Sequence, residues 1–219
     1  MILINGLTRG ELKSVAHHLL PYLYRLRHIE RWNLMRSTMP ENVAEHTYHV
    51  SLLTHVLCTI ARDIFGKKDV DPDRAAAYAL FHDATEVFTG DIPTPVKHHN
   101  PRILSNFREI ESLAADRLMA TIPDELKAAY RPLVAGDAGT SENAPLMKYV
   151  KAADTLDAYL KCVSEMAAGN REFATARKQT EEKLRGLAMP EVEWLLEHMA
   201  AGFEMTIDEL SEDEKMGES

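Results

Sequence analysis

The segment from His82 to Glu86 constrains the fold most, because it gathers a histidine and two acidic side chains within five positions. In a helix of about 3.6 residues per turn, His82 and Glu86 lie on one face, and Asp83 is also a neighbour of Glu86. Helices in a protein core rarely carry so much charge, so this segment predicts a pocket that holds a metal ion. The following segment 90–97 contains Gly90 and two prolines, a composition that ends a helix and stiffens a loop. We expect this loop to form a wall of the same pocket.

Length and charge limit the remaining possibilities. The chain has 219 residues, 45% of them hydrophobic, which predicts one domain with a sizeable core, although a division near residues 136–143 stays open from the sequence. The formal net charge of -9 argues against a face that binds a nucleic-acid polymer, but it leaves room for a small anionic substrate held by one or two cations. Cys58 and Cys162 fall in apolar helical patterns, so we expect two small buried side chains and no disulfide framework.

The sequence shows no sign of export or of a membrane span. Residues 1–6 do not join a charged region to a long apolar core, and no run approaches about 18 apolar residues. We therefore expect a soluble cytoplasmic protein with no membrane partner.

Amphipathic patterns bounded by capping residues predict the first helices. Residues 11–28 form such a pattern, and Pro21 predicts a kink or two short helices within it. The next helix is expected to begin at Pro40 or Glu41 and to end at Gly66. Its buried stripe alternates spacings of four and three and comprises His46, Val50, Leu53, Leu57, Ile60 and Ile64. An alanine-rich helix then begins at 71–72, Asp-Pro, and ends with His82–Asp83.

The same reasoning predicts four more helices. One begins at Asn100–Pro101 and stops at Ile122–Pro123, and a long one runs from Pro145 to Gly169–Asn170. Shorter patterns follow, at residues 173–187 and from Pro190 to Met199, and the acidic residues 211–219 indicate a disordered tail. Repeats, low-complexity segments and convincing strand patterns are absent from the sequence, so the predicted fold class is all-α.

Two polar residues lie on or beside buried faces of these helices, where each needs a hydrogen-bonding, ionic or metal partner. His46 lies on a buried stripe, where a lone histidine is more often a hydrogen-bonded core residue than a ligand. Asp154 lies beside apolar residues of the long helix, and burying a carboxylate unpaired is costly, so it predicts a metal or an arginine nearby. Asp157 is explained as a surface ion pair with Lys161, four residues later. The histidines that lie off the stripe or have no partner at ligand spacing are not candidate ligands: His17, His18, His28, His49 and His55.

A combination of these residues fits one divalent first-row metal, with positions left open for water and substrate. It takes two nitrogens and two carboxylates from three helices: His46, His82, Asp83 and Asp154. Arg31–Trp32, an adjacent cation and large aromatic, suits a phosphate and a ring or sugar. Composition alone favours the plainer alternative, a half-buried tryptophan beside a solvated arginine.

The order His, His-Asp, Asp resembles the HD-domain metal-dependent phosphohydrolases, and further motifs sharpen the match. They are Arg31–Trp32 ahead of Glu45–His46, the loop 89–97 (Thr-Gly-Asp-Ile-Pro-Thr-Pro-Val-Lys), Val-Lys-Ala-Ala-Asp at 150–154 and Ala-Tyr-Leu-Lys-Cys at 158–162. With them, the chain resembles the bacterial HD-domain 5′-deoxynucleotidases from about Ile29 to Asn170. The bare His, His-Asp, Asp order is moderately specific, whereas the loop joined to Arg-Trp is highly specific.

The resemblance implies a single-domain helical HD-domain bundle over residues 1–219, with an N-terminal helical extension at 1–28, and a homodimer. It implies metal ligation by His46, His82, Asp83 and Asp154. Glu86 would serve in acid–base chemistry, Arg31 would orient the phosphate, and Asp91 would complete the catalytic set. The implied substrate contacts are Arg31, Trp32, His46, Asp83, Asp91, Ile92, Pro93, Thr94 and Asp154, with Trp32 and Asp91 bordering the deoxyribose.

The implied reaction is the hydrolysis of deoxyribonucleoside 5′-monophosphates to deoxyribonucleosides and phosphate, with discrimination against ribonucleotides. The cofactor would be one divalent transition metal, Co²⁺ or Mn²⁺ ahead of Zn²⁺ or Fe²⁺, because mixed nitrogen and oxygen ligands suit all four. The alternatives are a phosphohydrolase for another small phosphate ester and a nucleotide-binding regulatory module. The signature of the latter would be a missing Glu86 or a missing ligand, and neither is missing. An oxygenase of this type would need a second iron, whereas the sequence offers one full ligand set.

Overall fold

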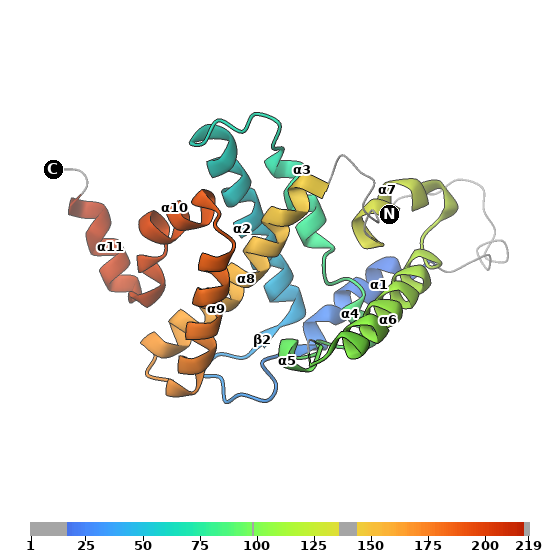
Figure 1. Cartoon of the computed structure of the whole chain (residues 1–219), viewed down its shortest axis with the longest axis horizontal. Helices are drawn as coiled ribbons and strands as arrows, with labels where there is room; N and C mark the ends of the chain where they lie inside the picture. The colour runs from blue at the N-terminus through green and yellow to red at the C-terminus, as the bar shows by residue number, and fades with distance from the viewer. Residues whose placement is uncertain (1–16, 98, 136–143, 217–219) are drawn as a thin grey trace, which may run out of the picture.

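The computed structural model describes residues 17–97, 99–135 and 144–216, and within these ranges the chain is almost entirely helical (Figure 1). In chain order the elements are α1 Leu19–Leu23, η2 Tyr24–His28, β1 Glu30–Arg31, β2 Glu41–Asn42, α2 Val43–Asp63, α3 Pro72–Leu80, α4 Glu86–Thr89, α5 Thr94–Lys97, α6 Pro101–Met119, α7 Asp124–Val134, α8 Ala144–Ala167, η3 Arg171–Phe173, α9 Ala174–Gly186, α10 Pro190–Met199, η4 Ala201–Glu204 and α11 Ile207–Met216. The prediction of an all-α, single-domain fold is confirmed. In the described ranges, no helix has both the length and the apolar character needed to span a bilayer.

Capping residues set the beginnings of the helices that carry the site. The side chain of Asn42 accepts hydrogen bonds from the amides of Ala44 and Glu45, and the Glu45 side chain accepts one from the amide of Asn42. This capping box starts α2 at Val43 rather than at Pro40 or Glu41. The expectation of no strand is wrong here, because β2 pairs with β1 in a two-stranded antiparallel ladder before the helix begins.

The helix starts at 71–72 and 100–101 are confirmed. The side chain of Asp71 caps α3 by accepting from the amide of Arg74, and that of Asn100 caps α6 by accepting from the amide of Ile103. In both helices a proline follows the cap, at a position where its missing N–H leaves no hydrogen bond unmade. Helix α7 was not predicted from the sequence.

Helices α2 and α8 form the centre of the molecule, with α3 on one side and α9 and α10 on the other (Figure 1). Their shared core includes Val50, Leu57, Ala75, Ala79, Tyr149, Val150, Leu156, Leu160, Leu184 and Val192. Ala75 and Ala79 are fully buried, which lets α3 approach α2 closely, as the alanine-rich sequence predicts. Cys58 and Cys162 are buried free thiols, as predicted, and burial raises their pKa values to about 12 and about 11.

A second, smaller cluster joins α1, α6 and α7 on the other side of the site. It consists of Leu19, Ala84, Ala115, Leu118, Met119, Ile122 and Val134. Because Ala84 belongs to this cluster while Tyr78 and Ala79 belong to the central one, the segment 82–86 connects the two. The site residues of this segment are therefore held from both sides.

Local structure differs from the sequence prediction in two further places. Helix α3 ends at Leu80 and α4 begins at Glu86, so the prediction that one helix carries His82 and Glu86 on one face is wrong. The amide of Glu86 donates to the carbonyl of Asp83 (3.0 Å) in a turn that keeps the two residues adjacent. Residues 211–216, expected to be disordered, form the end of α11.

The N-terminal region matches its prediction where it is described. Pro21 lies in α1, and α1 and η2 are two short helices, of which Leu19 and Leu26 are buried. The start of the expected pattern, at residues 11–16, lies outside the described residues, as does the possible division at 136–143.

Candidate active site

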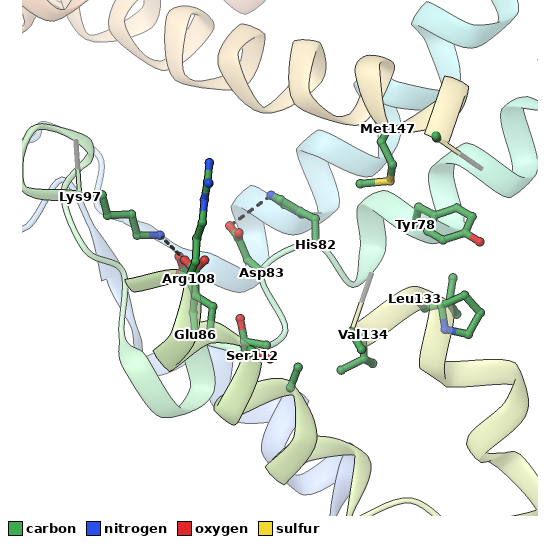
Figure 2. A pocket seen from close by; sticks show the side chains of 16 residues that line it. Tyr78, His82, Asp83, Glu86, Lys97, Arg108, Ser112, Leu133, Val134 and Met147 are labelled. Atoms are coloured by element: carbon green, nitrogen blue, oxygen red, sulfur yellow. Dashed lines mark ion pairs between the residues drawn. The ribbon is translucent and has the colours of Figure 1, made fainter. Parts of the chain in front are cut away.

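The predicted metal ligands converge where α2, the turn after α3, and α8 meet. Nε2 of His46 lies 3.4 Å from Oδ2 of Asp83 and 3.3 Å from Oδ1 of Asp154. Nε2 of His82 lies 3.1 Å from Oδ2 of Asp83, and Figure 2 shows these two side chains turned toward each other. One atom from each of His46, His82 and Asp154 falls within a mutual distance of 4.8 Å. Residues that are 108 positions apart in the sequence, from 46 to 154, thus form one cluster.

Both histidines are oriented by a hydrogen bond at the other ring nitrogen. Nδ1 of His46 donates to Oδ2 of Asp157 (2.7 Å), and Nδ1 of His82 donates to the carbonyl of Ala79 (2.7 Å). These bonds leave the two Nε2 atoms as the free nitrogens that face the cluster. Among the described residues, neither buried Nε2 atom has a hydrogen-bond partner. A divalent metal fits this arrangement, since it would accept both nitrogens and the two carboxylates.

The charges of the cluster also favour a cation. Burial lowers the pKa of His46, but the carboxylates of Asp154, Asp157 and Asp83 outweigh it and raise the net pKa well above its ordinary value. The pKa of Asp83 moves in the opposite direction: burial raises it, yet the two neighbouring histidines bring it well below its ordinary value. Positive charge is therefore stabilised at this position.

Asp157 was assigned wrongly from the sequence. It is buried and orients His46, with Nδ1 of His49 at 3.5 Å from its other oxygen, whereas Lys161 pairs with Glu165 at 2.6 Å. The sequence held a signal for this role, because Asp157 is three residues after Asp154 and therefore shares its helix face. A buried carboxylate behind a metal-binding histidine is a common arrangement.

Glu86 is the acidic residue at the first position of α4. It is buried, and within the described part of the chain its Oε2 atom has no hydrogen-bond partner. Burial, followed by the charges of Asp83 and Asp91, raises the pKa of Glu86 to about 9, against an opposing effect of Lys97. The side chain is therefore a neutral carboxylic acid at neutral pH, with a proton to donate.

A cavity of about 450 Å³ adjoins this cluster (Figure 2). Its lining includes His82, Asp83, Glu86, Lys97, Arg108 and Ser112, with an apolar wall of Tyr78, Leu133, Val134 and Met147. Lys97, from the predicted loop, is ion-paired with Glu111 at 3.1 Å. The expectation that this loop forms part of the pocket wall is met at Lys97. Arg108, Glu111 and Ser112 come from α6, for which the sequence predicted only a scaffold.

Arg31 lies on β1, close enough to the ligand cluster for the charges of its carboxylates to act on it. Its Nε donates to Oε1 of Glu41 at 2.7 Å, and the pairing of β1 with β2 holds the two residues side by side. Burial lowers the pKa of Arg31, but Glu41, Asp91 and the ligand carboxylates outweigh it and the net pKa is raised. The guanidinium is thus a largely buried, fixed cation within the field of the cluster. The alternative of a solvated arginine is wrong.

Trp32 is half-buried in a left-handed backbone conformation, with φ of 56°. The indole packs at 5.4 Å, between ring centroids, against the fully buried Phe173, and its buried Nε1 lacks a hydrogen-bond partner among the described residues. A residue of this size rarely adopts a positive φ, so its neighbours must hold it there. Both interpretations of Trp32, a sugar contact and a packing residue, fit this position.

The remaining predicted residues follow Gly90, whose φ of 72° allows the chain to turn at the end of α4. Asp91, Ile92 and Pro93 are partly buried, and the charge of Asp91 acts on both Arg31 and Glu86. Thr94 begins α5, and its side chain lies outside what the structure describes.

Comparison with known proteins gives this arrangement a family. The family described as 5′-deoxynucleotidase YfbR-like matches residues 18–203. This chain belongs to that family.

Relatives of the YfbR-like family match nearly the whole chain. A 5′-deoxynucleotidase of Vibrio parahaemolyticus is 40% identical over 194 residues, covering 89% of this chain and 98% of the relative. The 5′-deoxynucleotidase YfbR of Escherichia coli is 40% identical over 196 residues, covering 90% and 96%. The match extends beyond both ends of the 29–170 region from which the resemblance was drawn, so α1, η2 and α9–η4 are part of the family domain.

Solved structures confirm the fold of the YfbR-like family as an HD-domain bundle. An HD-domain phosphohydrolase of Listeria innocua superposes with a TM-score of 0.71 at 23% identity, covering 85% of this chain and 88% of the other. The cyanophage S-2L HD phosphohydrolase DatZ, solved with dA and one catalytic Zn²⁺ ion, gives a TM-score of 0.57 at 24% identity, covering 83% and 95%.

Proposed function

We propose that this chain is a metal-dependent 5′-deoxynucleotidase, which hydrolyses deoxyribonucleoside 5′-monophosphates to deoxyribonucleosides and phosphate. The observation that carries the proposal is the pair of buried Nε2 atoms of His46 and His82 beside the neutral acid Glu86. Among the described residues these atoms make no hydrogen bond, and their contacts with the carboxylates of Asp83 and Asp154 are 3.1–3.4 Å long. The relatives named 5′-deoxynucleotidase, about 40% identical, support the substrate class.

His46, His82, Asp83 and Asp154 are proposed to hold one divalent metal. When bound, such an ion polarises the phosphoryl oxygens and lowers the pKa of a coordinated water. Nitrogen and oxygen donors together suit several first-row metals, and among them we propose Co²⁺ or Mn²⁺, with Zn²⁺ and Fe²⁺ as the alternatives. The catalytic Zn²⁺ ion that the cyanophage phosphohydrolase binds supports a metal-dependent reaction.

The chain's own residues are proposed to position the phosphate and to move one proton. Arg31, fixed by Glu41, orients the phosphate as a largely buried cation. A water molecule adds to phosphorus as the bond to the 5′-oxygen breaks, and Glu86 delivers its proton to that departing oxygen; the proton that the water loses then restores the acid form of Glu86. Asp91 helps to keep Glu86 protonated before this step, because its charge raises the pKa of Glu86.

The sugar is proposed to lie between Trp32 and Asp91, with Ile92, Pro93 and Thr94 completing the substrate contacts. The indole is a wide apolar surface, and an added 2′-hydroxyl against it would be left without a hydrogen-bond partner. Such stranding costs about 1–3 kcal/mol, which corresponds to roughly 5- to 150-fold in rate. Replacing Trp32 by alanine should narrow the gap in kcat/KM between dAMP and AMP, mainly by admitting AMP. A destabilised variant with an unchanged ratio would leave Trp32 as a packing residue only.

The decisive experiment measures phosphate release from a panel of substrates with each metal in turn. The panel contains dAMP, AMP, the other deoxyribonucleotides and p-nitrophenyl phosphate, with Co²⁺, Mn²⁺, Zn²⁺ or Fe²⁺. We expect turnover of the deoxyribonucleotides, weaker turnover of AMP, and loss of activity with EDTA. Activity on p-nitrophenyl phosphate alone would favour the alternative of another small phosphate ester. Nucleotide binding without phosphate release would favour a regulatory module.

A homodimer and a cytoplasmic location remain predictions from the resemblance and the sequence.

A further inference from the structure

A second buried glutamate, Glu165, lies near the C-terminal end of α8, away from the ligand cluster. The residue is 2% exposed, and its carboxylate accepts hydrogen bonds from three donors in the loop that follows Trp32. The amide of Thr38 donates to both oxygens (3.1 and 2.9 Å), its hydroxyl donates at 2.7 Å, and the amide of Met39 donates at 3.2 Å. One carboxylate thus holds the end of this loop.

Two neighbouring side chains link Glu165 to the same loop. Nζ of Lys161 donates to Glu165 (2.6 Å) and to the carbonyl of Met39 (2.5 Å). Nδ2 of Asn170 donates to Glu165 (2.8 Å) and to the carbonyl of Arg36 (2.7 Å). The backbone groups of the loop that this network holds lie within residues 36–39.

Phe173 of η3, the segment that follows this end of α8, also supports the indole of Trp32. Phe173, which packs on Trp32, lies beneath the ammonium of Lys161 at 5.7 Å from its ring centroid. Trp32 itself is in a backbone conformation that a free tryptophan would leave. The network around Glu165 fixes the chain a few residues after Trp32, and Phe173 fixes the ring.

The helix joins this network to the ligand cluster. Asp154, Asp157, Lys161 and Glu165 follow one another at spacings of three, four and four residues. These spacings place them on one face of α8, over about 16 Å at about 1.5 Å per residue. The ligand and the residue that holds the loop are therefore parts of one rigid element.

We propose that Glu165 is a positioning residue that sets sugar selectivity by holding the 32–39 loop, and through it Trp32, in place. The proposal rests on the proposed contact between Trp32 and the sugar. Arg31 is held independently, by Glu41 and the strand pair, so phosphate binding should survive the loss of Glu165. Selectivity should therefore change more than turnover of dAMP.

The first test is the Glu165→Gln variant, which keeps the shape and removes the charge. We expect the ratio of kcat/KM for dAMP over AMP to fall by about 2- to 30-fold, the range for a residue that acts on a site through others. The matched control is Glu191→Gln. Glu191 is another fully buried glutamate, bonded to Lys67 (2.5 Å) and Tyr149 (3.1 Å), residues that belong neither to the loop nor to the site. A ratio unchanged in Glu165→Gln, or lowered equally in both variants, would overturn the proposal.

The second test asks whether Glu165 acts through Trp32. In a double variant with Trp32→Ala, the Glu165→Gln change should add nothing to the loss of selectivity, because the indole it positions is gone. Independent effects that multiply would overturn the proposal. If Trp32→Ala alone leaves the ratio unchanged, the sugar contact and the proposal that depends on it both fail, while phosphate release from dAMP still supports the nucleotidase.

The third test needs no substrate. The chain has two tryptophans, so in a Trp194→Phe background the fluorescence reports Trp32 alone. Adding Glu165→Gln should shift the emission to longer wavelength and increase quenching by acrylamide, whereas adding Glu191→Gln should not. Identical spectra and quenching with and without Glu165→Gln would overturn the proposal, even if the enzyme is active as expected.

Discussion

Glu86 and Glu165 are both buried glutamates, with 6% and 2% of their surfaces exposed, yet they occupy opposite electrostatic environments. Glu86 has an oxygen with no hydrogen-bond partner in the described structure, and burial and nearby carboxylates raise its pKa to about 9. Glu165 is surrounded by amide, hydroxyl and ammonium donors, which bring its pKa well below the ordinary value although burial opposes them. The two glutamates are buried to a similar extent, and what differs is the set of hydrogen-bond donors around each carboxylate.

The difference separates two uses of a buried carboxylate. An acid that keeps its proton for lack of donors can give that proton to a reacting oxygen. A carboxylate that a full set of hydrogen-bond donors keeps ionised has no proton to give, and it can only hold those donors in place. Asp154, whose side chain is partly exposed, represents a third case, in which the compensating charge is proposed to be a metal ion. Each case predicts a different response to substitution.

The largest effect is expected at Asp154. With Asp154→Ala, or equally with His82→Ala, one ligand is lost, and we expect metal content to fall and phosphate release to drop by more than about 1000-fold, because the metal is proposed to assist every step of the reaction. Elemental analysis of purified variants measures the first effect and a phosphate assay the second. Full metal occupancy in both variants would show that the ligand assignment is wrong.

Glu86→Gln tests the proton donor directly. The amide keeps the shape and cannot transfer a proton, so turnover should fall by about 100-fold or more with metal content preserved. By contrast, Glu165→Gln should lower the turnover of dAMP only a few-fold. Similar turnover in the two variants would remove the distinction between a reacting and a positioning glutamate.

Asp157 provides an intermediate case, since it holds a ligand rather than the metal. Asp157→Asn keeps a hydrogen-bonding side chain but loses the charge behind His46, and such a loss lowers metal affinity by about 10- to 100-fold. Titration with a competing chelator measures the change. High metal concentration should restore turnover in this variant and fail to restore it in Glu86→Gln. No difference in metal affinity from the parent would confine Asp157 to packing.

The smallest effect is the dependence of stability on acid. Because folding lowers the pKa of Glu165 below its usual value of 4.5, its stabilisation is present above about pH 4.5 and is lost as the pH falls below it. Glu165→Gln should lower the free energy of unfolding at pH 7 by about 1–3 kcal/mol and flatten its decline between about pH 5 and pH 3. Urea unfolding across this range measures both quantities. A parallel decline in parent and variant would mean that Glu165 does not titrate in this way.

The sequence predicted the four candidate ligands, which the structure brings together, but not the residues that support them. Apolar periodicity placed His46 on a buried face, cap residues placed the beginnings of α3 and α6, and the charge of Asp154 on a buried face called for a partner. Each of these signals lies within a single helix. The hydrogen bonds from His46 to Asp157 and from Thr38 to Glu165 join residues 111 and 127 positions apart, and no local pattern specifies which distant segment faces a carboxylate.

The turn at 82–85 shows why local patterns also fail. Spacing alone favoured a continuous helix through His82 and Glu86. Packing of Ala84 into the second core cluster, which is a tertiary contact, favours a turn instead, and the local hydrogen bond from Nδ1 of His82 to the carbonyl of Ala79 fits that turn. The turn brings the same side chains together as the helix would have done. The predicted ligands therefore converge although the helix prediction is wrong.

The two buried thiols make local unfolding of this protein measurable. Cys58 lies on α2 and Cys162 on α8, and with pKa values of about 12 and about 11 almost no thiolate exists at pH 7 in the folded chain. Both thiols are also fully buried, so a thiol reagent can modify either residue only after the helices around it separate. The rate of modification at each cysteine then reports how often the helices packed around that cysteine separate, in the parent and in every variant, without heat or denaturant.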